Sequence, residues 1–454
     1  MKDSKNLSRR DFLKRAGAAT ATALFYSLSP INILADDDDK KNRKDEPVHS
    51  DMTYRINRHT HDKVSILGYG MMRLPYKNRQ IDQEMVNQEV AYAIEHGVNY
   101  FDTSPHYCNS QSEASLGQAL KGFPRDKFMV ATKLSNFGQE EWSAEASKKM
   151  YYNSFKNLGV DVIDYYLLHG IGMGGMKSLN GRFIDNGMLD FLLEERKAGR
   201  IRNLGFSYHG EVEVFDYLLS INDKCHWDFV QIEMNYVDWE HAHDLNKRNT
   251  DAIYLNGELE KRGIQAVIME PLLGGRLARL PENLVKKLKA KRPDDSVASW
   301  AFRWVGTQPN TLTALSGMTT MEVLKENVKT FSPLDPVTKD EEELLMEVAA
   351  IYAGYHTIPC TACKYCMPCP YGVDIPGNFA FYNQGVTDGT LPPLDRSAED
   401  YKEKTAAFID AYKKAIPADA WATKCMDCGE CLSKCPQHIR IPNQMERLMD
   451  MLEA

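Results

Sequence analysis

The stretch from residue 128 to residue 169 contains three segments in order: FMVATK (128–133), AEASKKMYYNSFKNL (144–158) and VIDYYLLH (162–169). The first and third are apolar and rich in β-branched or aromatic residues, which is typical of buried strands. The middle segment has apolar residues three or four positions apart, which is typical of an amphipathic helix. This order indicates one βα unit followed by the next strand.

The same alternation extends in both directions along the chain. β-branched runs recur near residues 64, 98, 128, 163, 201, 228, 264 and 312. Amphipathic stretches lie between them at residues 84–95, 144–158, 187–197, 251–262 and 320–328. Eight βα units over about 270 residues favour a closed (β/α)8 TIM barrel over an open doubly wound sheet, and no GxGxxG motif follows the first run. We therefore predict a barrel over residues 56–335, with its chemistry at the carboxyl ends of the strands.

The composition is that of a globular protein with more than one domain. The chain has 454 residues, of which 43% are hydrophobic and 26% are charged. This length leaves room for a domain appended to the barrel. The 63 acidic residues outnumber the 55 lysines and arginines and give a net charge of −8. Net acidity argues against a nucleic-acid partner.

The first 35 residues have the character of an export signal. Basic residues dominate positions 1–15, and residues 16–35 carry no charge. The run SRRDFLK (8–14) resembles the twin-arginine signal. We expect residues 1–35 to direct export to the periplasm or another extracytoplasmic compartment, and residues 36–55 to form a charged linker. The apolar character is too modest for a stable membrane span, and a basic, partly helical tail is the alternative.

Polar side chains follow three successive strands of the predicted barrel. Asp102 and Tyr107 follow VNYF (98–101), Lys133 ends FMVATK, and His169 ends VIDYYLLH. Each alone also fits a structural role, such as a helix cap or a buried imidazole. Together they form an acid–base set, because a lysine fixed by an aspartate lowers the pKa of a nearby tyrosine. The histidine would donate a hydrogen bond to a carbonyl oxygen that is becoming negative.

These positions carry a resemblance to a known family. FDTSPHY (101–107), ATK (131–133) and LLHG (167–170) resemble the Asp, Tyr, Lys and His tetrad motifs of the aldo-keto reductase superfamily. The resemblance implies that the catalytic residues are Asp102, Tyr107, Lys133 and His169. It also implies hydride transfer between a nicotinamide cofactor and a small-molecule carbonyl or alcohol, with the tyrosine giving or taking the proton.

The resemblance also implies which residues hold the cofactor. Ser207 and Gln231 match positions that hold the carboxamide, and Met269 stands where an aromatic residue commonly stacks on the nicotinamide. The other matches are the pyrophosphate-facing glycines Gly274 and Gly275, then Gly317, and the adenine-contacting pair Glu326 and Asn327. Residues 317–324 contain no lysine or arginine to face a ribose 2′-phosphate. This favours NAD over NADP and leaves both open.

Eight of the ten cysteines lie beyond residue 359, in two runs that each end at a proline. The second run is CxxCxxCxxxCP, and the module resembles bacterial dicluster ferredoxins, although the first run is one residue shorter before its last cysteine. In that pattern three thiolates of one run and the last thiolate of the other hold each cluster. We expect two [4Fe–4S] clusters, one on Cys360, Cys363, Cys366 and Cys435, the other on Cys369, Cys425, Cys428 and Cys431.

The predicted second domain spans residues 336–454. About 55 residues separate the two cysteine runs, with helical character from residue 400 to residue 414. We therefore expect a small α-helical ferredoxin-like iron–sulfur domain rather than the compact form. Zinc on the CxxC pairs and disulfide bonds are the alternatives.

The combined prediction is an exported aldo-keto-reductase-like oxidoreductase whose two clusters relay electrons or stabilise the fold. Hydride carries two electrons, whereas an iron–sulfur centre passes one, and no flavin-binding signature bridges them. Free NAD(P)H is not expected outside the cytoplasmic membrane, so a tightly held nicotinamide that is recycled in place on sugar-like substrates would need no external donor. The alternative is an electron-transfer protein whose barrel docks a redox partner protein and whose tetrad is not catalytic.

Overall fold

The computed structural model describes residues 51–393 and 395–453. The predicted signal at 1–35 and residues 36–50 of the predicted linker lie outside the described residues. Eight strands close into a barrel in the order β10-β11-β12-β3-β6-β7-β8-β9, and all neighbouring pairs are parallel. They are β3 (Leu67–Gly70), β6 (Tyr100–Asp102), β7 (Met129–Leu134), β8 (Ile163–Ile171), β9 (Ile201–Tyr208), β10 (Phe229–Glu233), β11 (Gln265–Met269) and β12 (Thr311–Ser316). The predicted (β/α)8 barrel is confirmed.

The barrel interior is a packed core. The ring of Tyr165 makes edge-to-face contacts with Tyr100 and Phe229, at centroid distances of 4.8 Å and 5.1 Å. The chain neighbours Phe101 and Tyr166 belong instead to the larger core under the helices. Successive side chains of a strand point to opposite faces, and here both faces are covered. This is why the barrel strands read as continuous apolar runs in the sequence.

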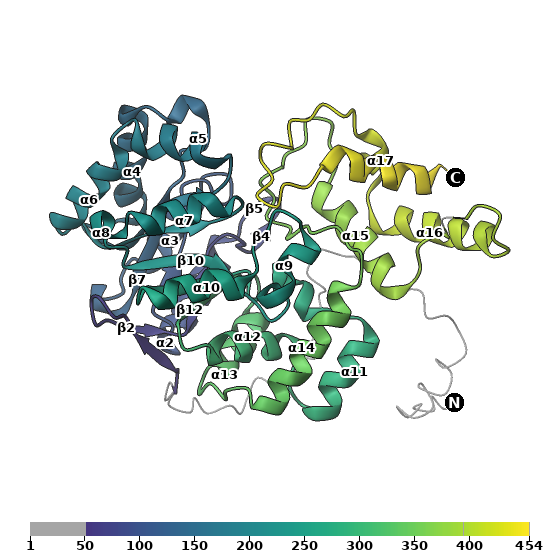
Figure 1. Ribbon diagram of the computed structural model, residues 1–454, viewed down its shortest axis with the longest axis horizontal. Helices are drawn as coiled ribbons and strands as arrows, with labels where there is room; N and C mark the ends of the chain where they lie inside the picture. The colour runs from purple at the N-terminus through teal and green to yellow at the C-terminus, as the bar shows by residue number, and fades with distance from the viewer. Residues whose placement is uncertain (1–50, 394, 454) are drawn as a thin grey trace, which may run out of the picture.

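Helices cover the outside of the barrel (Figure 1). Those that the periodicity predicts are α2 (Gln83–Glu95), α4 (Ala144–Leu158), α6 (Met188–Lys197), α10 (Ala252–Lys261) and α13 (Met321–Thr330). The others around the barrel are α3 (Ser112–Leu120), α5 (Gly175–Leu179), α7 (Val212–Ser220), α8 (Asn222–Cys225), α9 (Asp238–Leu245), α11 (Glu282–Lys291) and α12 (Val297–Thr307). Local chemistry sets the ends of α4: the Ser143 side chain accepts a hydrogen bond from the Ala146 N–H, and Gly159 ends the helix at a φ of 68°.

Two antiparallel hairpins accompany the barrel, β1 (Tyr54–Ile56) with β2 (Lys63–Ser65) and β4 (Tyr76–Lys77) with β5 (Gln80–Ile81). After the first strand of the β1–β2 hairpin, Asn57 donates from Nδ2 to the Tyr165 hydroxyl of the barrel interior at 2.8 Å. The hairpin therefore closes the amino end of the barrel, and the carboxyl end is left for ligands. The run near residue 64 supplies both β2 and the barrel strand β3.

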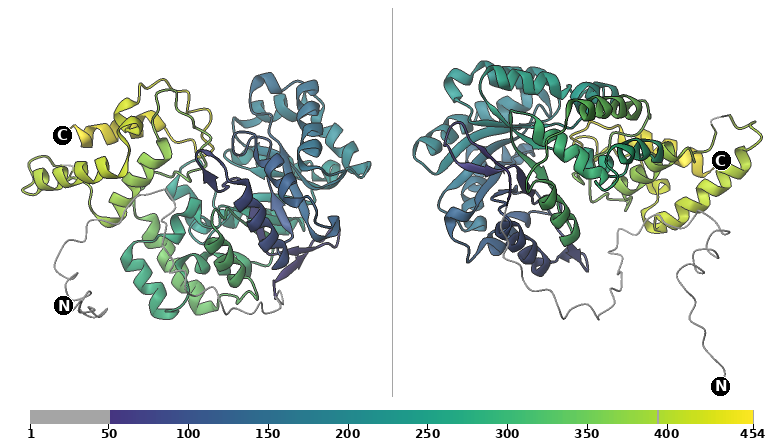
Figure 2. Two further views of the ribbon diagram at one scale, coloured as in Figure 1. Left: turned by 180° about the vertical axis from the view of Figure 1, so that it is seen from behind. Right: turned by 90° about the horizontal axis from the view of Figure 1, so that it is seen from below.

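Beyond the barrel the chain forms α14 (Lys339–Ala353), α15 (Ile375–Asp388), α16 (Tyr401–Ala415) and α17 (Ile441–Leu452). We call residues 355–393 and 395–453 the C-terminal lobe. Figures 1 and 2 show its helices on one side of the barrel, with the loops of the lobe turned towards the barrel. The lobe has its own core, which includes Phe379, Tyr382, Phe408, Tyr412 and Met445. The second, α-helical domain is thus confirmed. In the part of the chain that the structure describes, no helix is both long and apolar enough to span a membrane.

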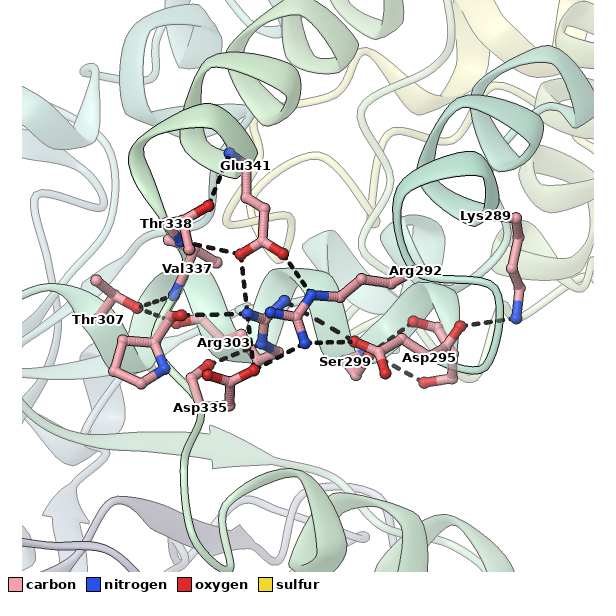
Figure 3. A network of polar contacts seen from close by, with 12 residues as sticks. Lys289, Arg292, Asp295, Ser299, Arg303, Thr307, Asp335, Val337, Thr338 and Glu341 are labelled. Carbon is pink, nitrogen blue, oxygen red and sulfur yellow. Dashed lines mark hydrogen bonds and ion pairs between the residues drawn. The ribbon is translucent and has the colours of Figure 1, made fainter.

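A network of ion pairs joins α14 to the barrel helices (Figure 3). Glu341, in the first turn of α14, accepts a hydrogen bond from Nη2 of Arg303 at 3.0 Å and another from Nε of Arg292. Asp335 pairs with Nη1 of Arg292 at 2.7 Å. The Thr338 side chain caps α14 by accepting from the Glu341 N–H, and the Glu341 side chain bonds back to the Thr338 N–H. The network fixes the start of the path from the barrel to the lobe.

Candidate active site at the barrel mouth

The four predicted catalytic side chains gather at the carboxyl mouth of the barrel. Asp102 is the last residue of β6, Lys133 lies near the end of β7, and His169 lies near the end of β8. The three strands are parallel neighbours, so their ends meet at one edge. Tyr107 follows β6 in a turn, where its N–H donates to the carbonyl oxygen of Ser104 at 3.1 Å.

Lys133 is fully buried between two acceptors. Its Nζ donates to Oδ1 of Asp102 at 2.6 Å and to the carbonyl oxygen of Thr103 at 2.8 Å. Burial lowers the pKa of Lys133, and the charge of Asp102 opposes that shift. Burial also raises the pKa of Asp102, and Lys133 opposes that shift in turn. Each charge therefore depends on the other to persist in the interior.

The surroundings of Tyr107 differ from the prediction. Nζ of Lys133 lies over the face of the Tyr107 ring, 4.9 Å from its centroid, and it donates to Asp102 instead of to the phenol. Burial raises the pKa of Tyr107 well above its usual value, and Tyr365 and Asp102 raise it further. Burial therefore outweighs the predicted lowering of this pKa by the charge of Lys133. The physical reason is that the lysine charge is directed to Asp102 while the phenol is buried.

His169 sits in surroundings that favour its neutral form. Its Nδ1 lies 2.6 Å from Oγ of Ser135 and 3.4 Å from Oγ of Ser104. Burial lowers the pKa of His169 well below its usual value, and the charges of Lys133 and Arg182 lower it further. When Nδ1 accepts from the Ser135 hydroxyl, the neutral ring carries its proton on Nε2 and can donate it to a ligand oxygen.

Two residues that the sequence analysis missed hold His169 in place. Ser135 contacts Nδ1 of His169. It lies two residues after the ATK motif, so its position in the sequence could have indicated a place in the site. Arg182 is also buried, and its Nη2 donates to the carbonyl oxygen of His169 at 2.5 Å. Its guanidinium lies over the Phe137 ring, 4.7 Å from the centroid. No sequence pattern around Arg182 predicted its contact with His169, because only the folded chain places Arg182 beside β8.

A third missed residue comes from the C-terminal lobe. The hydroxyl of Tyr365 lies 3.4 Å from Nε2 of His169 and within hydrogen-bonding reach of the Tyr107 hydroxyl. Its ring packs against Phe137, with the centroids 6.2 Å apart. In the sequence this tyrosine is only a spacer between two cysteines. The barrel site is therefore completed by the second domain.

The residues predicted for the nicotinamide lie together at the mouth. Oγ of Ser207 accepts from the Gly170 N–H at 2.9 Å, and Nε2 of Gln231 lies 3.6 Å from the Met269 sulfur. Oε1 of Gln231 is buried and has no hydrogen-bond partner among the described residues. A buried acceptor without a donor is unfavourable, so this position suits the NH2 group of a carboxamide. This end of the site fits a nicotinamide.

The residues predicted for the pyrophosphate have other partners. Gly274 adopts a φ of 70°, and a Cβ built on it would lie 2.6 Å from backbone atoms of Thr361. The Gly274 N–H bonds to the Glu270 carboxylate. Arg73 donates to the carbonyl oxygens of Gly274 and Thr361, at 3.2 Å and 2.5 Å. The backbone that approaches Gly274 is thus that of the C-terminal lobe, whereas the space beside Gly275 is open.

The other predicted cofactor residues are divided between buried and exposed positions. A Cβ on Gly317 would lie 3.2 Å from the Arg73 side chain. Nδ2 of Asn327 donates to Oγ of Ser316 at 3.0 Å inside the protein, so this amide already has a partner. Glu326 is exposed on α13. Of the predicted adenine pair, only Glu326 is therefore accessible.

The structure brings the eight clustered cysteines together in the two predicted sets. Burial raises the pKa of the Cys363 thiol, and Cys360, Cys435 and Cys366 raise it further, so these four lie close together. The pKa of Cys431 rises to about 11 through burial and through the other three thiols of the second set. In the predicted pattern each cluster takes its fourth cysteine from the other run, and this requires thiols of both runs to lie close together.

The chemistry of these donors fits iron–sulfur clusters. All ten cysteines lie among the described residues, and none forms a disulfide bond. Within residues 51–393 and 395–453, no three His, Cys, Asp or Glu side chains lie close enough together to hold a single metal ion. Four thiolates around a four-iron cluster stand further apart than four ligands around one zinc.

The first cysteine set lies against the barrel mouth. Arg276, after β11, donates to Oγ1 of Thr357, three residues before Cys360. Gln437, two residues after Cys435, donates from Nε2 to Oε1 of Glu233 at 2.8 Å. The second set is nearer to solvent, because Cys428 is exposed. One set therefore faces the tetrad and the other faces outward.

The fold and this mouth define a class of protein: a (β/α)8 barrel oxidoreductase to which an iron–sulfur domain is joined. The chain belongs to the aldo/keto reductase family, because the family model matches residues 66–348. A model of the 4Fe-4S dicluster domain matches residues 359–439, which contain both cysteine sets.

Individual relatives agree with this assignment. L-galactose dehydrogenase of Arabidopsis thaliana is 26% identical over 305 residues, which cover 64% of this chain and 91% of the relative. The NADH-specific methylglyoxal reductase of Escherichia coli is 24% identical over 300 residues, with 58% and 89% covered. A solved aldo-keto reductase of Bacillus halodurans in its holo form superposes with a TM-score of 0.53 at 23% identity. It covers 65% of this chain and 96% of its own, and at this identity the likeness supports the fold alone.

Proposed function

We propose that this chain reduces a small, sugar-like carbonyl compound, or oxidises the corresponding alcohol, at the mouth of its barrel. The observation that carries the proposal is the convergence of the Tyr107 hydroxyl and Nε2 of His169 beside the buried Lys133–Asp102 pair. Two donors that meet at one point can bind one oxygen atom. Relatives named as a galactose dehydrogenase and a methylglyoxal reductase support this substrate class.

Each side chain has a separate task in the proposed reaction. His169, neutral through burial, donates a hydrogen bond to the carbonyl oxygen as negative charge develops there. Tyr107 transfers its proton to that oxygen, and in the reverse direction it takes the proton back. Lys133, fixed by Asp102, places a positive charge against the tyrosine ring and so favours the phenolate that remains.

A nicotinamide dinucleotide would supply the hydride in reduction and accept it in oxidation. Ser207 and the unpaired Oε1 of Gln231 would hold its carboxamide. The absence of a lysine or arginine from residues 317–324 favours NAD over NADP. Retention of this cofactor inside the protein would let it be reduced and oxidised in place.

We propose that the lobe carries two [4Fe–4S] clusters, on the two cysteine sets. The placement of one set against the barrel and of Cys428 at the surface supports a relay of electrons between a redox partner protein and the barrel. The burial of Cys435 within the core of the lobe supports a structural contribution as well.

We also propose export by the twin-arginine pathway. The run SRRDFLK at 8–14 supports it, and the segment lies outside the described residues. Clusters inserted before export would reach the periplasm within a folded protein.

A second candidate function is electron transfer without carbonyl chemistry. The observation that favours it is Tyr365, whose hydroxyl lies against His169 where a substrate oxygen would bind. In that case the tetrad would be a docking surface for the lobe.

The substitution Tyr107→Phe tests the proposed function. We expect it to lower carbonyl turnover by about 100-fold or more, because the ring remains and only the transferable proton is lost. The matched control is Tyr166→Phe, since the Tyr166 hydroxyl is buried without a partner among the described residues. The assay is NADH oxidation with methylglyoxal and with aldose sugars, under anaerobic conditions. Equal turnover in both variants would favour the electron-transfer function.

A further inference from the structure

We propose that residues 357–366 of the C-terminal lobe form a lid over the reaction site, and that substrate and dinucleotide bind only when this lid is displaced. The inference rests on the proposed function, because it concerns regulation of the same site. Two contacts of the lid support it, one at the position of the reacting oxygen and one at the pyrophosphate position. The hydrogen bonds that hold the lobe on the barrel mouth support it as well.

The first contact blocks the position of the reacting oxygen. Tyr107 and His169 are the two groups that should bind this oxygen, and the Tyr365 hydroxyl already lies against both of them. One hydroxyl and a carbonyl oxygen cannot occupy the same point between two donors. A substrate oxygen can therefore bind only after Tyr365 leaves.

The second contact covers the pyrophosphate position. Backbone atoms of Thr361 lie 2.6 Å from where a Gly274 side chain would begin, which is closer than an ordinary contact allows. Arg73, a cation that suits a phosphate, donates instead to the Thr361 carbonyl oxygen at 2.5 Å. The Gly274 N–H, a second phosphate donor, is directed at the half-buried Glu270 carboxylate. Protein groups thus satisfy the donors that an anionic cofactor needs.

Tyr365 lies on the mouth together with the loop that carries it, because the Thr361 carbonyl oxygen of the same loop accepts from Arg73. Its ring is held between Phe137 and His169, at centroid distances of 6.2 Å and 6.5 Å. In the chain it stands two residues after Cys363 and directly before Cys366. Opening therefore moves the loop that carries three ligands of the first cysteine set.

The fourth ligand of the same set belongs to a second anchor. Gln437 donates to Glu233, and Nδ2 of Asn246 donates to the Gln437 carbonyl oxygen at 2.6 Å. Cys435 lies two residues before this anchor. Both segments that hold the lobe on the mouth are thus tied to one cysteine set, so the state of that set controls access to the site.

The test compares Tyr365→Ala with Tyr371→Ala in the anaerobically purified full chain. Tyr371 is 46% exposed on the same lobe and serves as the control. We expect Tyr365→Ala to tighten NADH binding, and to lower the KM for methylglyoxal, by about tenfold, because a closed lid reduces apparent affinity by the fraction of open molecules. Iron content should be unchanged in both variants. If Tyr365→Ala keeps its full iron content but binds NADH equally or more weakly than the parent protein, the lid proposal is wrong.

Hydrogen exchange tests the lid without any turnover. Saturating NADH should raise amide exchange in residues 357–366 of the parent protein, since the dinucleotide and the lid compete for one space. Gly274→Ala should raise the same exchange without NADH, because its methyl group meets Thr361. Gly275→Ala bears the same backbone strain, at a φ of 95°, but its methyl group has open space, so it should not raise the exchange. Protection of 357–366 by NADH would contradict the proposal. If Tyr107→Phe does not lower turnover, the proposed function is wrong, but the hydrogen-exchange result still tests whether residues 357–366 cover the site.

Discussion

Lys133 and Asp102 show how one ion pair can serve both stability and chemistry. Both side chains are buried, and Oδ2 of Asp102 has no hydrogen-bond partner in the part of the chain that the structure describes. Taking two charges out of water is costly, and their attraction offsets that cost only while both remain. Stability alone would be served equally well by two apolar side chains, so the pair is retained for the site.

Substitutions at this pair should separate stability from activity. Lys133→Met leaves the Asp102 carboxylate buried and alone, and we expect it to lower the free energy of unfolding by about 3–5 kcal/mol. The double variant Asp102→Leu/Lys133→Met removes both charges and should regain most of that loss, while carbonyl turnover stays absent. Urea denaturation monitored by circular dichroism measures the first quantity and NADH oxidation the second. A double variant as unstable as the single one would contradict this account.

At the scale of elements, the periodicity of the sequence located helices better than their ends. The apolar spacing predicts a helix over residues 187–197, and α6 begins at Met188, because Gly187 takes the left-handed conformation with a φ of 71°. The stretch 144–158 matches α4 without any shift, since Ser143 and Gly159 mark both of its ends. Cap residues are local, so the sequence alone can give such boundaries.

The first turn of α14 depends on an interaction that periodicity cannot show. Burial would raise the pKa of Glu341, but hydrogen bonds from Arg292, the Thr338 N–H and Arg303 outweigh it and lower the pKa to about 2. The folded state therefore binds the Glu341 proton more weakly than the unfolded chain, in which a glutamate has a pKa of about 4.3. This contribution to stability is complete above about pH 4.5 and is lost as the pH falls towards 2.

Glu341→Gln should remove this pH-dependent stabilisation. We expect a loss of about 3 kcal/mol at neutral pH, because two arginines lose their shared carboxylate, and a smaller difference from the parent below about pH 3. Glu342→Gln is the matched control, since Glu342 lies in the same helical turn but is exposed. Thermal or urea denaturation between pH 3 and pH 7 gives the measurement. Parallel stability curves for Glu341→Gln and the parent protein would show that the carboxylate does not titrate as described.

At the scale of the whole molecule, the C-terminal lobe and the barrel share one site. The lobe has a core of its own, yet it contributes Tyr365 to the tetrad and Thr361 to the glycine turn after β11. The two cysteine sets differ accordingly. Cys363 lies in the loop against the barrel, and Cys428 is exposed at the far set.

Cysteine variants should distinguish the two cysteine sets. We expect Cys363→Ser and Cys428→Ser each to lose about four of about eight irons, because each breaks one cluster. Only Cys363→Ser should raise amide exchange in residues 357–366, since its loop covers the barrel mouth. Cys225→Ala, a buried cysteine outside both sets, should keep all of its iron. Iron analysis and electron paramagnetic resonance give the readouts, and the loss of all iron from either serine variant would indicate one shared centre.

The sequence by itself determined the barrel, the presence of a second domain, and the residue types of the tetrad and the cysteine sets. These features are local or periodic: strand and helix patterns repeat along the chain, and CxxC spacing lies within one loop. Only the tertiary structure decided that Lys133 meets Tyr107 at the face of its ring, that Arg182 holds His169, and that Tyr365 reaches the site from nearly 200 residues away. Such contacts join segments with no common sequence pattern: the first two arise when the loops of the closed barrel meet at its mouth, and the third when the core of the lobe packs against the barrel.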